Sequence, residues 1–185
     1  MSEQETLYRR SPKAPFERRA YTFLIDFILV WLISSLVTNL FLEFIVFTFL
    51  WLALRAIVVQ ANKGQSLGRW AMDLKIIDLK LNRPPSLLNL CKREAILATI
   101  AFAAMIGLKI NFRDILLMFL FLTPIIVDTV TVFSDDENSQ SLHDRFANTI
   151  ITQTRRGFSL DLRIKKLIKE LEELWEKKRK DRGNN

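Results

Sequence analysis

The feature that most constrains this chain is an apolar run, residues 21–38, that contains a single acid, Asp26. An α-helix rises about 1.5 Å per residue, so the run is long enough to cross the hydrocarbon core of a bilayer. A carboxylate near the bilayer centre costs about 2.5–3.5 kcal/mol on insertion scales, so Asp26 requires a partner or a proton. We therefore predict a membrane helix whose acid faces other parts of the protein.

Three further apolar runs follow the first and favour a membrane protein over a soluble core. The run before Leu108 is short, and it spans a bilayer only if its helix begins near Leu87. That start places Lys92, Arg93 and Glu94 in the opening turns, where we expect them at the interface. The predicted fold class is an all-α integral membrane protein, a four-transmembrane-helix bundle. Its spans cover about residues 21–38, 40–59, 87–108 and 115–133, within a membrane domain of residues 21–154.

Lysine and arginine residues are distributed unevenly around these spans. Five precede Tyr21, seven lie between residues 60 and 93, twelve follow Phe133, and the turn at residues 39–43 has none. This asymmetry predicts a multi-pass protein with both termini, including the tail of residues 1–20, and the loop of residues 60–86 in the cytoplasm. No small-x-small cleavage site follows the first run, so we expect a retained anchor.

The net charge of +7 has a membrane explanation. Surface cations attract anionic lipids by about 1 kcal/mol each, so the lipid bilayer with its anionic lipids is the expected partner. Nucleic acid is not expected, because no basic stretch is interleaved with aromatic residues on a soluble fold.

Arg55 interrupts the second apolar run at the depth of Asp26. The first span runs outward and the second returns, so the start of one and the end of the other share a depth. Both side chains lie about 6–8 Å below the cytoplasmic boundary at about 1.5 Å per residue. Because a buried charge requires a partner, we predict an ion pair between them.

Three more ionisable residues reach the same layer. Asp128 lies near the cytoplasmic end of the fourth span, after Pro124, which we expect to bend that helix, and Arg93 and Glu94 open the third. The layer then holds one surplus negative charge unless a carboxyl is protonated, a cation binds or Arg19 reaches in. The candidate transport or ion-pair cluster consists of Arg19, Asp26, Arg55, Arg93, Glu94 and Asp128.

The loop of residues 60–86 contains Gly64, Ser66 and Gly68 in the pattern G-x-S-x-G. A nucleophile elbow requires a preceding strand and a hydrolase sheet, which the sequence lacks, so we expect Ser66 to start a helix or to lie in an interfacial turn with Trp70 at the headgroup level. Residues 73–80 and 148–154 are rich in β-branched side chains, which predicts that they pair as a small cytoplasmic β-ribbon.

The only histidine, His143, precedes Asp144 and Arg145. A general base is one interpretation, and a structural hydrogen bond at the cytoplasmic face is the favoured one. One histidine and one cysteine, Cys91, do not make a zinc site, and a single cysteine excludes an internal disulfide. We therefore predict no metal, no cofactor and no enzymatic activity.

Apolar residues recur at helical spacing from Ser159 onward, with charged residues on the opposite face. This pattern predicts a cytoplasmic amphipathic helix over residues 159–182, which lies on the membrane or docks on a partner. A homo-oligomer or a larger membrane complex is therefore one expectation.

Three stretches in this order resemble the RDD family of small integral membrane proteins. They are the entry of the first span from Arg19 to Asp26, the segment from Gly64 to Asp78, and residues 141–149. Arg19 and Asp26 match the family's arginine and first aspartate, and Asp128 or Asp144 supplies the other. Asn148 stands where the family more often has a glycine.

The resemblance implies a membrane location, and cation/proton exchange is attributed to some family members. One hypothesis is therefore ion transport, such as an antiporter, in which Asp26 and Asp128 with Arg55 form a proton- or cation-responsive site. The alternative is a non-catalytic membrane scaffold or assembly factor, in which the charges lock the helices and the loop and C-terminal helix bind a partner.

Overall fold

The computed structural model describes residues 13–110, 114–135 and 139–154, together with residues 159–160, 162–164, 166–170 and 172–173. The described residues between 160 and 173 are helical, in agreement with the predicted C-terminal helix. The remainder of that helix, residues 174–182, and residues 1–12 of the predicted tail lie outside the described part. The elements in chain order are α2 (Phe16–Ser34), α3 (Leu40–Leu52), η1 (Ala53–Ile57), α4 (Val58–Ala61), α5 (Leu67–Ala71), β1 (Leu74–Asp78), α6 (Leu87–Lys109), α7 (Ile115–Phe133), α8 (Leu142–Phe146) and β2 (Thr149–Gln153).

Side-chain caps explain where two of the long helices begin. The Asn39 side chain accepts hydrogen bonds from the backbone N–H groups of Phe41 and Leu42 at the start of α3. Ser86 accepts one from the Asn89 N–H at the start of α6. Such caps satisfy donors that have no partner within the helix.

The first helix is shifted relative to its predicted span of residues 21–38. It begins at Phe16, directly after Pro15, and ends at Ser34. The apolar pattern did not include the opening turn because that turn carries charged side chains.

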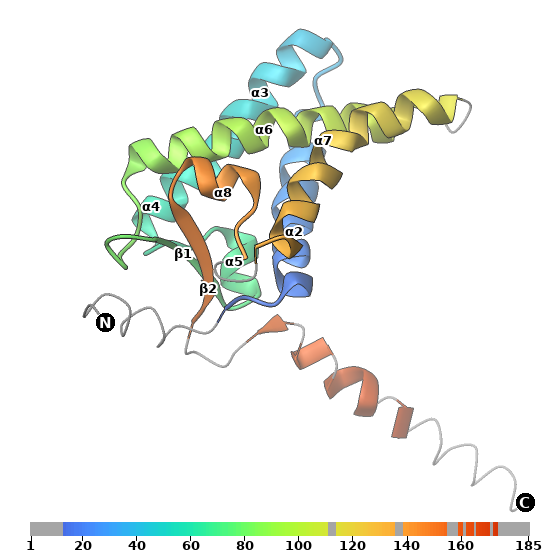
Figure 1. Ribbon diagram of the computed structural model, residues 1–185. Helices are drawn as coiled ribbons and strands as arrows, with labels where there is room; N and C mark the ends of the chain where they lie inside the picture. The colour runs from blue at the N-terminus through green and yellow to red at the C-terminus, as the bar shows by residue number, and fades with distance from the viewer. Residues whose placement is uncertain are drawn as a thin grey trace, which may run out of the picture.

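The long helices pack around an aromatic core, and the three-element run α3–η1–α4 lies against α2 and α6 (Figure 1). The Phe47 and Trp51 rings stack at 5.6 Å between centroids, and Phe102 of α6 lies 5.5 Å from the Phe47 ring. Such contacts are worth about 0.5–1.5 kcal/mol each beyond the area that they bury. The buried members of this core are Phe27, Val30, Phe47, Trp51, Leu54, Leu97, Ala98, Ala101, Phe102 and Met105.

Two helices depart from regular α-helical geometry close to charged residues. The five residues of η1 form a π-helix around Arg55, an irregularity that the apolar pattern did not predict. π-Helical turns are rare and often occur at functional sites. In α7, Pro124 lies inside the helix, and the ribbon changes direction midway along α7, as predicted (Figure 1).

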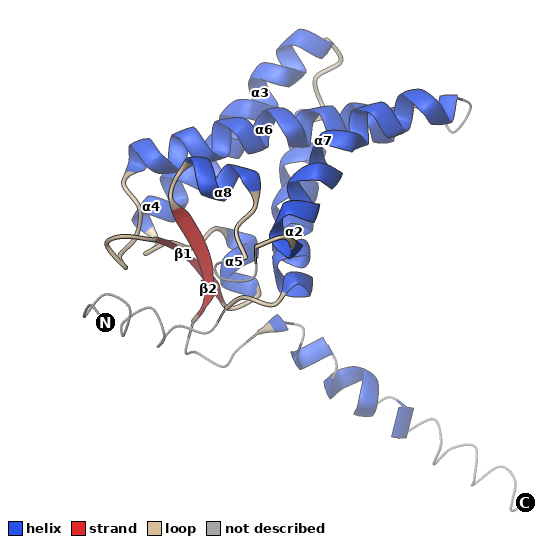
Figure 2. Ribbon diagram, viewed as in Figure 1, coloured by secondary structure: helices blue, strands red, loops and turns tan. Residues whose placement is uncertain are grey.

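The predicted β-ribbon is present. Strands β1 and β2 pair antiparallel, with Ile76 opposite Ile151, and lie beside α5 and α8 (Figure 2). Asn148, just before β2, has a φ of 50°. Asparagine tolerates this left-handed conformation better than most residues, which explains how it stands where the family more often has a glycine.

Two described helices are long and apolar enough to cross a membrane, Leu40–Ala61 and Ile115–Phe133, with mean hydropathies of 2.2 and 2.3. Only 6% of the apolar window of α7 is buried, so α7 is not the core helix of a soluble protein. Helices α2 and α6 do not meet this test, because each carries several charged residues. The four-span bundle is therefore not confirmed, and spans one and three stay predictions.

Candidate functional site

Asp26 of α2 lies at the centre of a buried polar site. Its Oδ2 atom lies 2.9 Å from Arg55 Nη1, which confirms the predicted ion pair, and accepts a hydrogen bond of 2.7 Å from the Ser66 hydroxyl. Its Oδ1 atom accepts a 2.8 Å hydrogen bond from the Gly68 N–H. Ser66 also caps α5 by accepting from the Arg69 N–H. The G-x-S-x-G segment therefore binds the buried acid, and Ser66 starts a helix as predicted.

The two glycines of this segment are required by close approaches of the backbone. A Cβ atom at Gly68 would lie 2.3 Å from the Thr22 carbonyl oxygen and 3.0 Å from Asp26 Oδ1. Gly64 has a φ of 94°, and a Cβ there would lie 2.4 Å from the Ile76 carbonyl oxygen. Gly64 thus allows the loop to pack closely on β1, and Gly68 allows α5 to pack closely on α2.

Glu94 of α6 is the hub of the arginine side chains. Its carboxylate lies 2.8 Å from Arg55 Nε and 3.0 Å from Arg69 Nη2, and it is also paired with Arg93. The Trp51 indole N–H donates a further hydrogen bond of 3.1 Å. Both Arg93 and Glu94 are fully buried within the protein, and the interfacial position of this helix end stays a prediction. Ionised groups at full burial require partners of this kind.

The second half of the network joins α7 and α8. Arg93 Nε donates to Asp144 Oδ1 at 2.7 Å, and His143 Nδ1 lies 2.8 Å from Asp128 Oδ2. Arg93 Nη2 lies 3.0 Å from His143 Nε2. Because a guanidinium only donates, we infer that Nε2 is the acceptor and that Nδ1 carries the proton, donated to Asp128. His143 is thus hydrogen-bonded on both sides in its neutral form.

Asp144 is also held by the Ser141 hydroxyl, which donates at 2.9 Å. Burial by itself raises the pKa of Asp144, but Arg93, followed by His143 and Arg19, lowers it well below its ordinary value. Arg145, the third member of this motif, remains outside the network. Its side chain is half exposed and lies 3.7 Å from Asp135 Oδ2.

One of the predicted routes removes the surplus of negative charge, because Arg19 reaches into the layer. The loop contributes Arg69 and α8 contributes Asp144, neither of which was counted in the layer. Arg19 donates to the backbone carbonyl oxygens of Ile151, at 3.1 Å, and Ser139. The site then balances four carboxylates against four guanidinium groups. The carboxylates belong to Asp26, Glu94, Asp128 and Asp144, and the guanidinium groups to Arg19, Arg55, Arg69 and Arg93.

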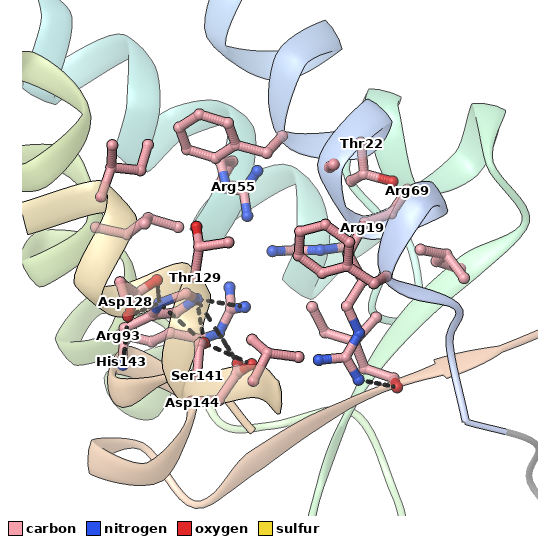
Figure 3. A pocket seen from close by; sticks show the side chains of 18 of the residues that line it. Arg19, Thr22, Arg55, Arg69, Arg93, Asp128, Thr129, Ser141, His143 and Asp144 are labelled. Carbon is pink, nitrogen blue, oxygen red and sulfur yellow. Dashed lines mark hydrogen bonds and ion pairs between the residues drawn. The ribbon is translucent and has the colours of Figure 1, made fainter. Parts of the chain in front are cut away.

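A cavity of about 330 Å³ lies between α2, α7 and the elements that carry the network, among them α5, α6 and α8. Figure 3 shows Arg19, Arg55 and Arg69 on one side and Asp128, His143 and Asp144 on the other. Burial, together with Arg55 and Arg93, lowers the pKa of Arg69 to about 9. The sequence analysis did not identify Arg69 as a site residue. Its spacing was the available signal, because Arg69 follows the capping Ser66 by three residues and so lies on the same, buried side of α5.

Among the described residues, no group of three or more His, Cys, Asp or Glu side chains could hold a metal ion. A separate ion pair joins Glu43, at the start of α3, to Lys109, at the end of α6. The Glu43–Lys109 pair lies at the opposite end of α3 and α6 from the network and joins the two helices there.

Comparisons with known proteins give one result. A sequence model of the RDD family matches residues 13–148, which is well over half of the chain. No curated protein and no solved structure matches. Together with the two apolar helices, this match indicates a membrane protein. The residues that carry the resemblance to the family meet in the buried network. They are Asp26, the Gly64–Gly68 segment and the region of Asp144. The chain belongs to the RDD family.

Proposed function

We propose that this protein takes part in proton-coupled transport across a membrane, and that it is not an enzyme. The observation that carries the proposal is the His143–Asp128 pair, which lines the cavity and ties α7 to α8. Histidine is the side chain whose charge ordinarily changes near neutral pH. The proposed arrangement is a multi-pass protein with cytoplasmic termini, so that this pair faces the cytoplasmic end of the membrane domain.

Protonation of His143 has a direct structural consequence. A proton added to Nε2 turns it into a donor that faces the donor Nη2 of Arg93, 3.0 Å away. The two groups must then separate, because two N–H donors repel at this distance. Arg93 is also bonded to Glu94 and Asp144, so the separation would shift α6 and α8 relative to each other. Proton binding is thereby coupled to the position of α7 against the remainder of the molecule.

The network supports protons over alkali cations as the coupled species. The carboxylates of Asp26 and Glu94 already accept several hydrogen bonds each from arginine, serine or backbone donors. An added cation would have to displace a guanidinium group that neutralises the same carboxylate. Cation binding at these acids therefore costs a buried ion pair, whereas a proton binds at His143 without displacing a bound ion.

The experiment is proton flux in proteoliposomes that contain a trapped pH-sensitive dye, with an imposed salt or pH gradient. Native protein should change the internal pH, and Asp128→Asn and His143→Gln should each abolish the change. Glu43→Gln is the matched control, since it neutralises a buried, paired carboxylate that does not line the cavity, and it should transport normally. Native rates in Asp128→Asn and His143→Gln would contradict the proposal, as would native protein no faster than empty liposomes.

A scaffold or assembly role is the second candidate. The fully paired chain from Asp26 through Arg55 and Glu94 to Arg93 joins α2, η1 and α6, which is what a rigid lock requires. It predicts that pull-downs from membrane extracts recover specific proteins with the full chain and lose them when residues 158–185 are removed. Recovery of the same proteins without this segment, or of none with it, would remove this candidate.

A further inference from the structure

The cavity has a polar wall and an apolar wall. The apolar wall is built by α2 and α7, which contribute aromatic and aliphatic side chains to the lining besides their polar ones. Leu24 and Phe16 of this wall are 46% and 36% exposed, so the apolar side of the cavity reaches the outer surface of the helices. The apolar side chains in the lining from these two helices are Phe16, Ala20, Phe23, Leu24, Ile125 and Val132.

The polar wall has an excess of positive charge, although the network as a whole is balanced. Two of the four acids, Asp26 and Glu94, do not line the cavity, because they point into the contacts between α2, η1, α5 and α6. Asp128 and Asp144 remain as the lining carboxylates. All four guanidinium groups line it, those of Arg19, Arg55, Arg69 and Arg93. An anion is therefore favoured in the cavity over a cation.

Arg69 supplies donors that the described part of the chain does not use. It is fully buried, and its Nη2 atom donates to Glu94 at 3.0 Å. Its Nε and Nη1 atoms are buried and have no hydrogen-bond partner among the described residues. Buried donors are almost always satisfied, and each of these N–H groups can donate to an oxygen of a carboxylate or phosphate. Burial, followed by repulsion from the neighbouring Arg55 and Arg93, lowers the pKa of Arg69, which an anion beside it would counteract.

We propose that this cavity binds an amphiphilic anion, a molecule with a phosphate or carboxylate head bonded by Arg69 and a hydrocarbon chain lying between α2 and α7. The apolar wall excludes a fully hydrated ion as the preferred ligand, and the charged wall excludes an uncharged chain. This proposal does not rest on proton transport, because it requires only the cavity and the unpartnered guanidinium donors of Arg69.

The test measures thermal unfolding of the full chain in phosphatidylcholine nanodiscs that are titrated with dodecyl phosphate or with dodecanoate. Ligand that binds the folded state raises the unfolding midpoint in proportion to its affinity. At least one of the two should raise it, and the one that acts at the lower concentration identifies the head group. Dodecyltrimethylammonium, dodecyl maltoside and inorganic phosphate, which each lack the anionic head or the chain, should not.

Two variants probe the two walls separately. Arg69→Lys keeps one cation for Glu94 but removes the open nitrogens, and it should weaken binding about tenfold or more. Ala20→Phe fills the apolar wall without changing any charge and should weaken binding similarly. Arg83→Lys, the same substitution at an exposed loop arginine, is the matched control and should bind as native.

Several results would overturn the site. They are the absence of any shift with both anionic amphiphiles, an equal shift with inorganic phosphate, or native affinity in both Arg69→Lys and Ala20→Phe. Since no proton gradient is applied, failure here leaves the transport proposal unaffected, and failure of flux leaves this site unaffected.

Discussion

Substitution of Gly68 by alanine is a sharp test of how the network is assembled. The added methyl would lie 2.3 Å from the Thr22 carbonyl oxygen and 3.0 Å from Asp26 Oδ1. The first contact is with backbone of α2, which a rotamer change does not relieve. Helix α5 must therefore move away from α2, and the 2.8 Å hydrogen bond from the Gly68 N–H to Asp26 is lost or lengthened.

The magnitude follows from three contributions. Overpacking costs about 1–3 kcal/mol. Loss of a hydrogen bond to a charged group costs about 1.5–3 kcal/mol. Alanine is a better helix former than glycine by about 1 kcal/mol, which offsets part of this. The net expectation is a destabilisation of about 1.5–5 kcal/mol, because the lost hydrogen bond by itself already exceeds the gain in helix propensity.

The assay is the free energy of unfolding in mixed micelles for Gly68→Ala, Asp26→Asn and the double variant. The two changes should be strongly non-additive, since both disrupt the same contact. Gly107→Ala is the control. A Cβ there would lie 3.0 Å from Phe121 Cβ and 3.2 Å from the Met118 carbonyl oxygen, both longer than the 2.3 Å contact at Gly68 and away from the network, so the loss should be smaller. A Gly68→Ala protein as stable as native, or strictly additive with Asp26→Asn, would refute the reasoning.

Three further predictions use the same unfolding assay. Gly64→Ala should destabilise by about 2 kcal/mol or more, because the residue has a φ of 94° and its Cβ would meet the Ile76 carbonyl oxygen at 2.4 Å; native stability would contradict the geometry. Glu94→Gln should cost about 3–5 kcal/mol by leaving buried guanidinium groups without their counter-charge, and more than Glu43→Gln, whose partner Lys109 is 39% exposed. Asp144 has a pKa below its ordinary value, so its stabilisation is present above about pH 4 and is lost as the pH falls further; Asp144→Asn should flatten the acid limb of the stability curve, and an unchanged limb would argue against it.

The sequence predicted the parts of this fold that depend on local pattern. The apolar runs located the long helices, and the β-branched runs located β1 and β2. The Asp26–Arg55 pair followed from counting residues along antiparallel helices, because helical rise is constant. A contact between residues at the same depth in the two helices of one hairpin is therefore predictable from spacing alone.

The remaining contacts depend on tertiary packing and were not predictable in the same way. Arg69 lies on a five-residue helix in a loop, and its direction is set by the contact between Gly68 and Asp26. The position of Arg93 and Glu94 near the start of α6 does not reveal that the loop and α8 cover both side chains, and that cover brings in Asp144. Arg69 and Asp144 add one charge of each sign to the predicted layer, so the surplus inferred from the spans is removed only by Arg19, which was one of the predicted routes.

Arg93 and Arg69 differ in a way that connects the two proposed activities. All three nitrogens of the Arg93 guanidinium are engaged, by Asp144, Glu94 and His143, whereas two nitrogens of Arg69 have no hydrogen-bond partner among the described residues. A proton on His143 adds positive charge to a wall that already has an excess of it, and an anion at Arg69 removes that excess. Each ligand therefore lowers the electrostatic cost of the other, and by linkage the two must bind cooperatively if both bind. A network that is neutral as a whole but positive towards its cavity suits the joint binding of a proton and an anion better than the binding of a metal cation.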